Sequence, residues 1–504
     1  MRRAGILLAV SASFAVVSAS GAAGASLVTV SGPDPYAACS TAAETGTNFA
    51  DTEVEPQVAV NPTNGANIIG AWQQDRWSDG GAQGLVAGFS SNGGKSWGES
   101  TLPFSACAPG AIDDPFTGSP YNRASDPWVS FGPDGTAYAS AVLVNDSNEG
   151  LPGTTDTGVA TATSGDGGKT WGSVRLEKSD QGTTPVFGDT QFFNDKASIT
   201  ADPDQAGVAY LVWDRTKSPS STLSAILNAQ TIRGPAWFSK TSDFGRTWTT
   251  ARPIFDPGER NTTLGNIIVV DPRNGTLYDF FAEFANAGNP NRTPRGISIA
   301  FIKSTDGGNT WSHATNVSTQ DVVFDADPNT GQLLRTEEEL PSVAIDPATG
   351  QLYVVWEDAR FTGGTVNQVV ISTSTDGGAT WSAPAAVSGS QSNGMPAFNP
   401  TVAVNANGTV GVTYYDMRNL PAGDTTTLPT DVWLTTSTDH GATFGNETHV
   451  AGSFDMLSAP QGPDGFFLGD YEALGVSGTA FMPFFATGNT GADSNPTDIL
   501  TGSF

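Results

Sequence analysis

The sequence predicts an all-β protein built as a β-propeller, a ring of four-stranded sheets called blades. The first observation is a phrase that occurs six times: a Ser or Thr, an Asp or Asn two residues later, then Gly, a second hydroxyl and an aromatic ring. The closing aromatics lie 63 to 77 residues apart, at Trp97, Trp171, Trp248, Trp311, Trp381 and Phe444. A repeat of this size, made of short strands, is typical of a radial array.

The second observation is a strand–hairpin–strand pattern upstream of the phrases. In the fifth unit, apolar residues 341–345 lead through the turn 346–350 (Asp-Pro-Ala-Thr-Gly) into residues 352–356. Such turns between alternating apolar segments indicate β-hairpins. A third strand precedes each phrase and the aromatic opens a fourth, so each unit predicts one antiparallel blade.

The phrase itself is expected to hold the fold. An Asp in a tight turn accepts hydrogen bonds from backbone N–H groups that follow it, and Gly supplies positive φ without steric cost. The aromatic ring can then be buried between neighbouring sheets. Asn92 replaces the Asp in the first copy, and Phe444 replaces Trp in the last.

The third observation is an incomplete seventh unit at the C-terminal end. Residues 469–474, 480–486 and 498–504 are strand-like, which makes three strands. Residues 26–30 could supply the fourth and close the ring by joining the two ends of the chain, which removes exposed sheet edges. We therefore predict seven blades; six blades with an added hairpin is the alternative.

The N-terminal segment predicts export. Residues 1–25 combine Arg2 and Arg3, an apolar stretch and a small-residue cleavage site, as in a secretory signal peptide. Residues 26–504 are then expected to form one propeller domain without a membrane span. The formal net charge of −28 disfavours nucleic acid as a partner. We expect a secreted monomer.

Two cysteines, Cys39 and Cys107, are the only ones in the chain. In an oxidising compartment an isolated pair predicts one disulfide. The three histidines are scattered along turns, so the sequence predicts neither a metal site nor another cofactor.

Charged residues gather where the predicted second strands end, on the face opposite the repeated phrases. Four of them are arginines in a chain with 23 Lys and Arg in total: Arg76, Arg215, Arg360 and Arg418. An Arg cluster can bind a ligand carboxylate through paired hydrogen bonds, with Asp358 and Glu339 beside it. The alternative is that each Arg forms a salt bridge between blades.

The six phrases resemble the Asp boxes of the BNR repeat proteins of the sialidase superfamily, over nearly all of residues 26–504. The resemblance implies an Arg cluster for a substrate carboxylate, a Tyr nucleophile assisted by a Glu, and an Asp acid/base. By position these roles fall to Tyr471 with Glu472, and to Asp126 or Asp195. The chain lacks the Arg-Ile-Pro phrase of sialidases, and sialidases have six blades.

Two functions follow from this resemblance. The first is an exported sialidase-like glycoside hydrolase that acts on acidic glycans. The second is a non-catalytic secreted propeller that binds glycans or protein partners at the cell surface. Trp77, Trp128 and Trp237 lie near long predicted loops and are candidates for stacking on sugar rings.

Overall fold

The computed structural model describes residues 26–40, 46–146, 155–182, 191–218, 233–285, 296–388, 394–445, 447–462, 464–492 and 494–504. Within these ranges the protein is all-β, as predicted, with one short 3₁₀ helix, η2 (Met456–Ser458). No helix in this part of the chain is long and apolar enough to cross a membrane. The proposed signal peptide, residues 1–25, lies outside the described residues.

The strands of the N-terminal half form antiparallel sets of four. The first set is β2 (Glu53–Val60), β3 (Ile68–Arg76), β4 (Ala82–Ser90) and β5 (Gly98–Thr101). The second is β6 (Arg123–Phe131), β7 (Ala137–Asp146), β8 (Thr155–Ser164) and β9 (Gly172–Asp180). The third is β10 (Gln191–Ala201), β11 (Ala209–Ser218), β12 (Ala236–Thr241) and β13 (Arg252–Phe255).

The C-terminal half continues the series. The fourth set is β14 (Asn261–Asp271), β15 (Thr276–Ala285), β16 (Gly296–Ser304) and β17 (Thr315–Gln320). The fifth is β19 (Ser342–Ile345), β20 (Leu352–Asp358), β21 (Gln368–Ser374) and β22 (Ala385–Ala386). The sixth is β23 (Ala397–Val404), β24 (Val410–Asp416), β25 (Pro429–Ser437) and β26 (Thr448–Asp455).

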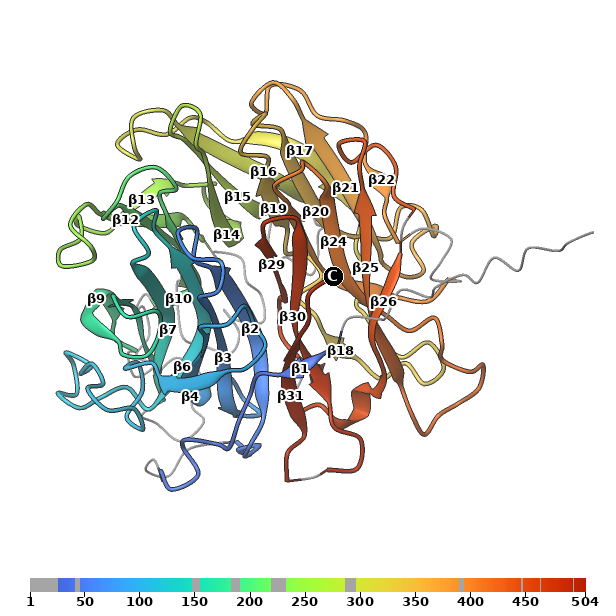
Figure 1. Ribbon diagram of the computed structural model, residues 1–504, viewed down its shortest axis with the longest axis horizontal. Helices are drawn as coiled ribbons and strands as arrows, with labels where there is room; N and C mark the ends of the chain where they lie inside the picture. The colour runs from blue at the N-terminus through green and yellow to red at the C-terminus, as the bar shows by residue number, and fades with distance from the viewer. Residues whose placement is uncertain are drawn as a thin grey trace, which may run out of the picture.

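The last set joins the two ends of the chain. It contains β29 (Ala473–Ser477), β30 (Ala480–Gly488), β31 (Thr497–Thr501) and β1 (Val28–Thr29). Val28 pairs with Thr501 and Thr29 with Leu500, so the segment expected to complete this sheet does pair with it. Figure 1 shows β1 lying beside β31 where the blue and red ends of the ribbon meet.

The first strands of successive sets contact one another in chain order, from β2 through β6, β10, β14, β19 and β23 to β29. Strand β29 in turn contacts β2, so the series closes on itself (Figure 1). The first two sets are joined into one eight-stranded sheet by the single pair Ala82–Ala124. Divided at that pair, the strands form seven sets of four around one axis.

The repeated phrase forms the expected turn. In the second copy, Asp166 Oδ1 accepts hydrogen bonds from the Ser164 hydroxyl (2.8 Å) and the Thr170 amide (3.0 Å). Gly168 has φ of 91°, and a Cβ there would meet the Ile69 side chain of the preceding set at 2.8 Å. Glycine is therefore required both by the turn and by the close packing of neighbouring sheets.

The core lies between successive sheets. One cluster joins the second and third sets through Tyr138, Val142, Ile199 and Trp213, all buried. Cys39 and Cys107 form the predicted disulfide, which closes a loop with a sequence separation of 68 residues.

Five of the seven first strands contain a β-bulge at the same level, where one extra residue interrupts the pairing with the second strand. Each bulge includes a residue with φ between 49° and 68°: Glu55, Asp126, Lys196, Gly265 and Asn399. A bulge redirects the side chain that it carries, and bulges are common beside active sites. Here they place polar groups around the axis of the ring.

A further sheet of three short strands, outside the seven sets, lies next to these bulges. Strand β18 (Leu334–Arg335) pairs with β28 (Gly465–Phe467), which pairs with β27 (Gln461–Gly462). The segment that follows β18 carries Glu337, and the segment that follows β28 carries Asp470 and Tyr471.

Candidate functional site

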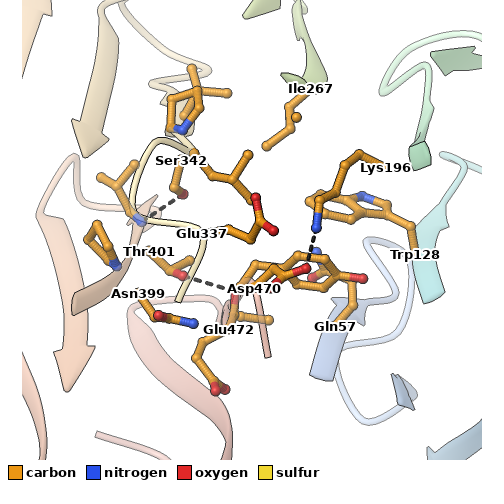
Figure 2. A pocket seen from close by; sticks show the side chains of 18 of the residues that line it. Gln57, Trp128, Lys196, Ile267, Glu337, Ser342, Asn399, Thr401, Asp470 and Glu472 are labelled. Carbon is orange, nitrogen blue, oxygen red and sulfur yellow. Dashed lines mark hydrogen bonds and ion pairs between the residues drawn. The ribbon is translucent and has the colours of Figure 1, made fainter. Parts of the chain in front are cut away.

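A cavity of about 190 Å³ lies at the axis of the ring. Each of the seven first strands contributes to its wall, through Gln57, Trp128, Lys196, Ile267, Ser342, Thr401 and Ala473. The segments that precede β19 and β29 add Glu337, Asp470 and Tyr471 (Figure 2). Because side chains from distant parts of the sequence converge here, the cavity is the candidate site.

Asp470 is the centre of the charge network of this cavity. Its carboxylate pairs with the ammonium group of Lys196, as Figure 2 shows, and accepts two hydrogen bonds from Arg335: Nε to Oδ1 at 3.1 Å and Nη2 to Oδ2 at 2.9 Å. Arg335 Nη2 also lies 3.5 Å from Glu337 Oε1. The two cations therefore share one fully buried carboxylate, and Arg335 makes a longer contact with a second.

Glu337 and Asp470 are driven toward opposite protonation states. Burial acts on both, but Arg335 and Lys196 outweigh it at Asp470 and lower the pKa of that carboxyl. At Glu337 burial dominates and raises the pKa, although Lys196 acts against it. The Glu337 side chain is 26% exposed, so a ligand in the cavity can reach it.

Asp126 lies on the same wall, on the bulge of β6. Its Oδ2 accepts the backbone N–H of Lys196 at 3.0 Å, and its Oδ1 accepts the Ser125 hydroxyl at 3.3 Å. These bonds orient the carboxylate. Asp195 accepts the same N–H at 3.0 Å, but it is not among the residues that line the cavity. Of the two predicted acid/base candidates, only Asp126 lines it.

Two aromatic side chains form one side of the cavity. The rings of Trp128 and Tyr471 lie with their centroids 5.3 Å apart, at an angle of 60°. The Tyr471 hydroxyl donates to the carbonyl of Pro127 at 3.2 Å. Burial and the surrounding carboxylates raise the pKa of Tyr471 well above its ordinary value, so this hydroxyl stays protonated.

The predicted pairing of Tyr471 with Glu472 is not found in the structure. The Glu472 side chain accepts a hydrogen bond from the Tyr415 hydroxyl at 2.5 Å and another from the Ala486 amide at 3.2 Å. In Figure 2 its carboxylate points away from Asp470. Glu472 is among the residues that line the cavity, as Tyr471 is, but these two bonds hold its carboxylate between the last two sheets.

The four predicted arginines do not converge on one pocket. Arg215 pairs with Asp180, Arg360 with Asp358, and Arg418 with Asp416 and Glu447. Only the Arg215–Asp180 pair joins two sets, as the alternative interpretation expected; Arg360 and Arg418 pair with carboxylates of their own sets. Neither these arginines nor Asp358 or Glu339 are among the residues that line the axial cavity.

Arg76 differs from the other three arginines. It is 5% exposed, donates from Nη1 to the side-chain oxygen of Gln73 at 2.7 Å, and has no ion-pair partner among the described residues. It lines a small niche beside Arg335 instead of the cavity.

No group of three or more His, Cys, Asp or Glu side chains is arranged to hold a metal ion in the part of the chain that the structure describes.

Sequence reasoning missed Lys196, Arg335 and Glu337. A signal for Lys196 was present, because a polar residue followed by Pro recurs at the bulges: Glu55-Pro56, Asp126-Pro127 and Asn399-Pro400. Lys196-Ala197 occupies the same place in the third set. Arg335 and Glu337 lie between two sets, in a segment that no repeat describes, so no periodic signal marks them.

Neither a family model nor a curated protein matches this sequence. Solved structures with a related arrangement include the α-L-arabinanase of Penicillium chrysogenum, at 12% identity over 89% of this chain and 92% of that one, with a TM-score of 0.42. A Hadza microbial sialidase, Hz136, has 15% identity over 87% and 73% of the two chains, with a TM-score of 0.45. The Trypanosoma rangeli sialidase has 10% identity over 90% and 54%, with a TM-score of 0.41. The fold rests on the strand pairing itself, and these distant likenesses carry no assignment of activity.

Proposed function

We propose that the protein is an exported glycoside hydrolase whose active site is the axial cavity. The observation that carries the proposal is that Glu337 and Asp470, two carboxyl groups of one cavity wall, have pKa values shifted in opposite directions, together with the Trp128–Tyr471 pair. Groups whose surroundings drive their pKa values apart are the usual source of an acid and a base in one site. The disulfide supports an extracellular location.

In this proposal Glu337 is the general acid. Its raised pKa keeps a proton available for the oxygen of the leaving group, and its partial exposure lets that oxygen approach. Asp126 is the second carboxylate of the hydrolysis, held by the Lys196 amide. Lys196 and Arg335 keep Asp470 ionised, and the Asp470 carboxylate holds these two cations beside the cavity.

The charges of the cavity favour a neutral sugar over an acidic one. Asp126, Glu337 and Asp470 line the cavity, and Lys196, the cation that lines it with them, already pairs with Asp470. A ligand carboxylate would find no guanidinium among the residues that line the cavity, because Arg215, Arg360 and Arg418 are paired elsewhere and Arg76 lines a separate niche. We therefore infer a neutral glycoside that stacks on Trp128 and Tyr471, instead of the acidic glycan that the sialidase resemblance implies.

The test is hydrolysis of a panel of chromogenic glycosides, neutral pentosides and hexosides beside α-sialosides and glucuronides. With the substrate that is cleaved, Glu337→Gln and Asp126→Asn should each lower kcat by about 10²-fold or more. Glu339→Gln is the matched control, since Glu339 belongs to the same segment but does not line the cavity. Equal activity of all three variants would contradict the assignment of the site.

A non-catalytic glycan-binding propeller is the second candidate. Two observations favour it. The Asp470 carboxylate is already occupied by hydrogen bonds and ion pairs within the protein. The Tyr471 hydroxyl donates to a backbone carbonyl instead of to a carboxylate base. In that case the folded protein cleaves no glycoside of the panel, while Trp128→Ala abolishes binding to a glycan array. Tyr471→Phe distinguishes a Tyr471 that acts as a nucleophile from one that only stacks on a sugar ring, because only a nucleophile requires the hydroxyl group.

A further inference from the structure

A niche separate from the axial cavity is lined by two arginines. Arg76 and Arg335 contribute to its wall together with the aromatic residues Phe49, Trp77 and Phe467. Both guanidinium groups lie over the Phe467 ring, with the central carbon of Arg76 at 4.5 Å and that of Arg335 at 4.8 Å from its centroid. The open space measures about 10 Å³, enough for one occupant the size of a water molecule.

The positive charge of this niche is only partly compensated. Arg76 is buried, and its single hydrogen bond to a side chain goes to the neutral amide of Gln73. Arg335 uses Nε and Nη2 on Asp470, which leaves its Nη1 without an acceptor among the described residues. The two guanidinium groups also repel each other, and burial together with this repulsion lowers the pKa of Arg76. An uncompensated buried charge costs several kcal/mol.

We propose that Arg76 and Arg335 form a binding site for a halide-sized monovalent anion such as chloride. The free N–H groups of two guanidiniums supply donors, the aromatic walls exclude water, and the volume admits one atom-sized occupant. Asp464 on the rim is exposed and pairs with neither arginine, so it leaves the niche open to an external anion.

The bound anion would act on the axial cavity through Arg335. This side chain contacts the anion on one side and both Asp470 and Glu337 on the other. A negative charge in the niche offsets the stabilisation that Arg335 gives to an ionised Glu337. The charged groups around Arg76 are Glu55, Asp126, Asp470 and Arg335, and none of the three carboxylates lies within ion-pair distance of it.

Crystals grown in sodium bromide test the site directly. Anomalous diffraction should show a bromide between Arg76 and Arg335 in the wild type and none in Arg76→Gln. Water density without anomalous signal in the wild type would overturn the proposal.

Thermal unfolding gives a second readout that does not depend on activity. At constant ionic strength, replacing sodium gluconate by sodium chloride should raise the wild-type Tm saturably, on the order of 1 °C. Arg76→Gln should lose this response, and Arg273→Gln, which alters an exposed arginine paired with Asp271, should keep it. An equal response of the wild type and Arg76→Gln would refute the site. An equal effect of acetate would refute a halide and indicate a carboxylate ligand.

Discussion

The arginines at the ends of the second strands and the cations at the ring axis are both surrounded by carboxylates, yet their pairing differs. At the strand ends three of the four arginines have an acid of their own: Arg215 with Asp180, Arg360 with Asp358, Arg418 with Asp416 and Glu447. At the axis, Lys196 and Arg335 share Asp470, and Glu337 is left with a contact of 3.5 Å.

The difference shows why residue type alone does not locate the site. Matched pairs satisfy their charges and hold neighbouring elements together, so they have no capacity left for a ligand. At the axis two cations share one acid, and burial raises the pKa of another carboxyl, Glu337, which favours the protonated form that acid catalysis requires. The predictions below test this contrast, beginning with the largest expected effect.

Lys196→Met should have the largest effect on stability. It removes a buried partner of Asp470 and leaves Asp126 and Glu337 with less positive charge, which should lower the free energy of unfolding by about 3–5 kcal/mol. Urea unfolding measures it. The double variant Lys196→Met/Asp470→Asn should recover part of the loss. A loss below about 1 kcal/mol for the single variant would show that the axial network is not the stabilising unit inferred here.

Asp279 shows a third arrangement, after the matched pairs and the shared acid: a buried carboxyl group with no paired cation among the described residues. Neither of its oxygens has a hydrogen-bond partner among the described residues, and burial raises its pKa well above the ordinary value. The native state must therefore hold a proton that the unfolded state releases above about pH 4. Its contribution to stability is present below that pH and is lost as the pH rises toward the folded pKa, by about 1.4 kcal/mol per unit.

Asp279→Asn should remove this dependence. Unfolding free energies measured from pH 4 to pH 7 should fall more steeply in the wild type than in the variant. Asp306→Asn is the control, since Asp306 is an exposed turn residue whose pKa is lowered by its hydrogen bonds to about 2, below this range. Parallel curves for the wild type and Asp279→Asn would contradict a protonated Asp279.

The repeats predicted the fold because each copy contains its own turn chemistry. The hydrogen bonds of Asp166 and the close approach of Gly168 to Ile69 are local or involve the adjacent sheet, so they are visible in the spacing of the sequence. The site was only partly predictable, because Arg335 and Glu337 come from a segment outside the repeats. Only the three-stranded sheet of β18, β27 and β28 brings that segment to Asp470.

Arg418→Gln should lower stability less than Lys196→Met and, unlike a change at the axis, should leave activity unchanged. The Arg418 guanidinium lies 3.8 Å from the centre of the Trp433 ring and donates to Asp416 Oδ2 at 2.5 Å and to Glu447 Oε2 at 2.6 Å, with 11% of its side chain exposed. Its loss leaves Asp416 and Glu447 without their cation, which should cost about 1–3 kcal/mol of unfolding free energy.

Because Arg418 does not line the cavity, kcat/KM for a cleaved glycoside should stay within about twofold of the wild type. The sialidase resemblance implies the opposite for a substrate-binding arginine, a large fall in kcat/KM with little change in stability. Measuring both quantities on the same protein preparation therefore decides between a structural salt bridge and a carboxylate clamp. The same two measurements apply to Arg360→Gln. The Arg360 side chain pairs with Asp358 and is 26% exposed, so its loss should lower the free energy of unfolding by less, and kcat/KM should again stay unchanged.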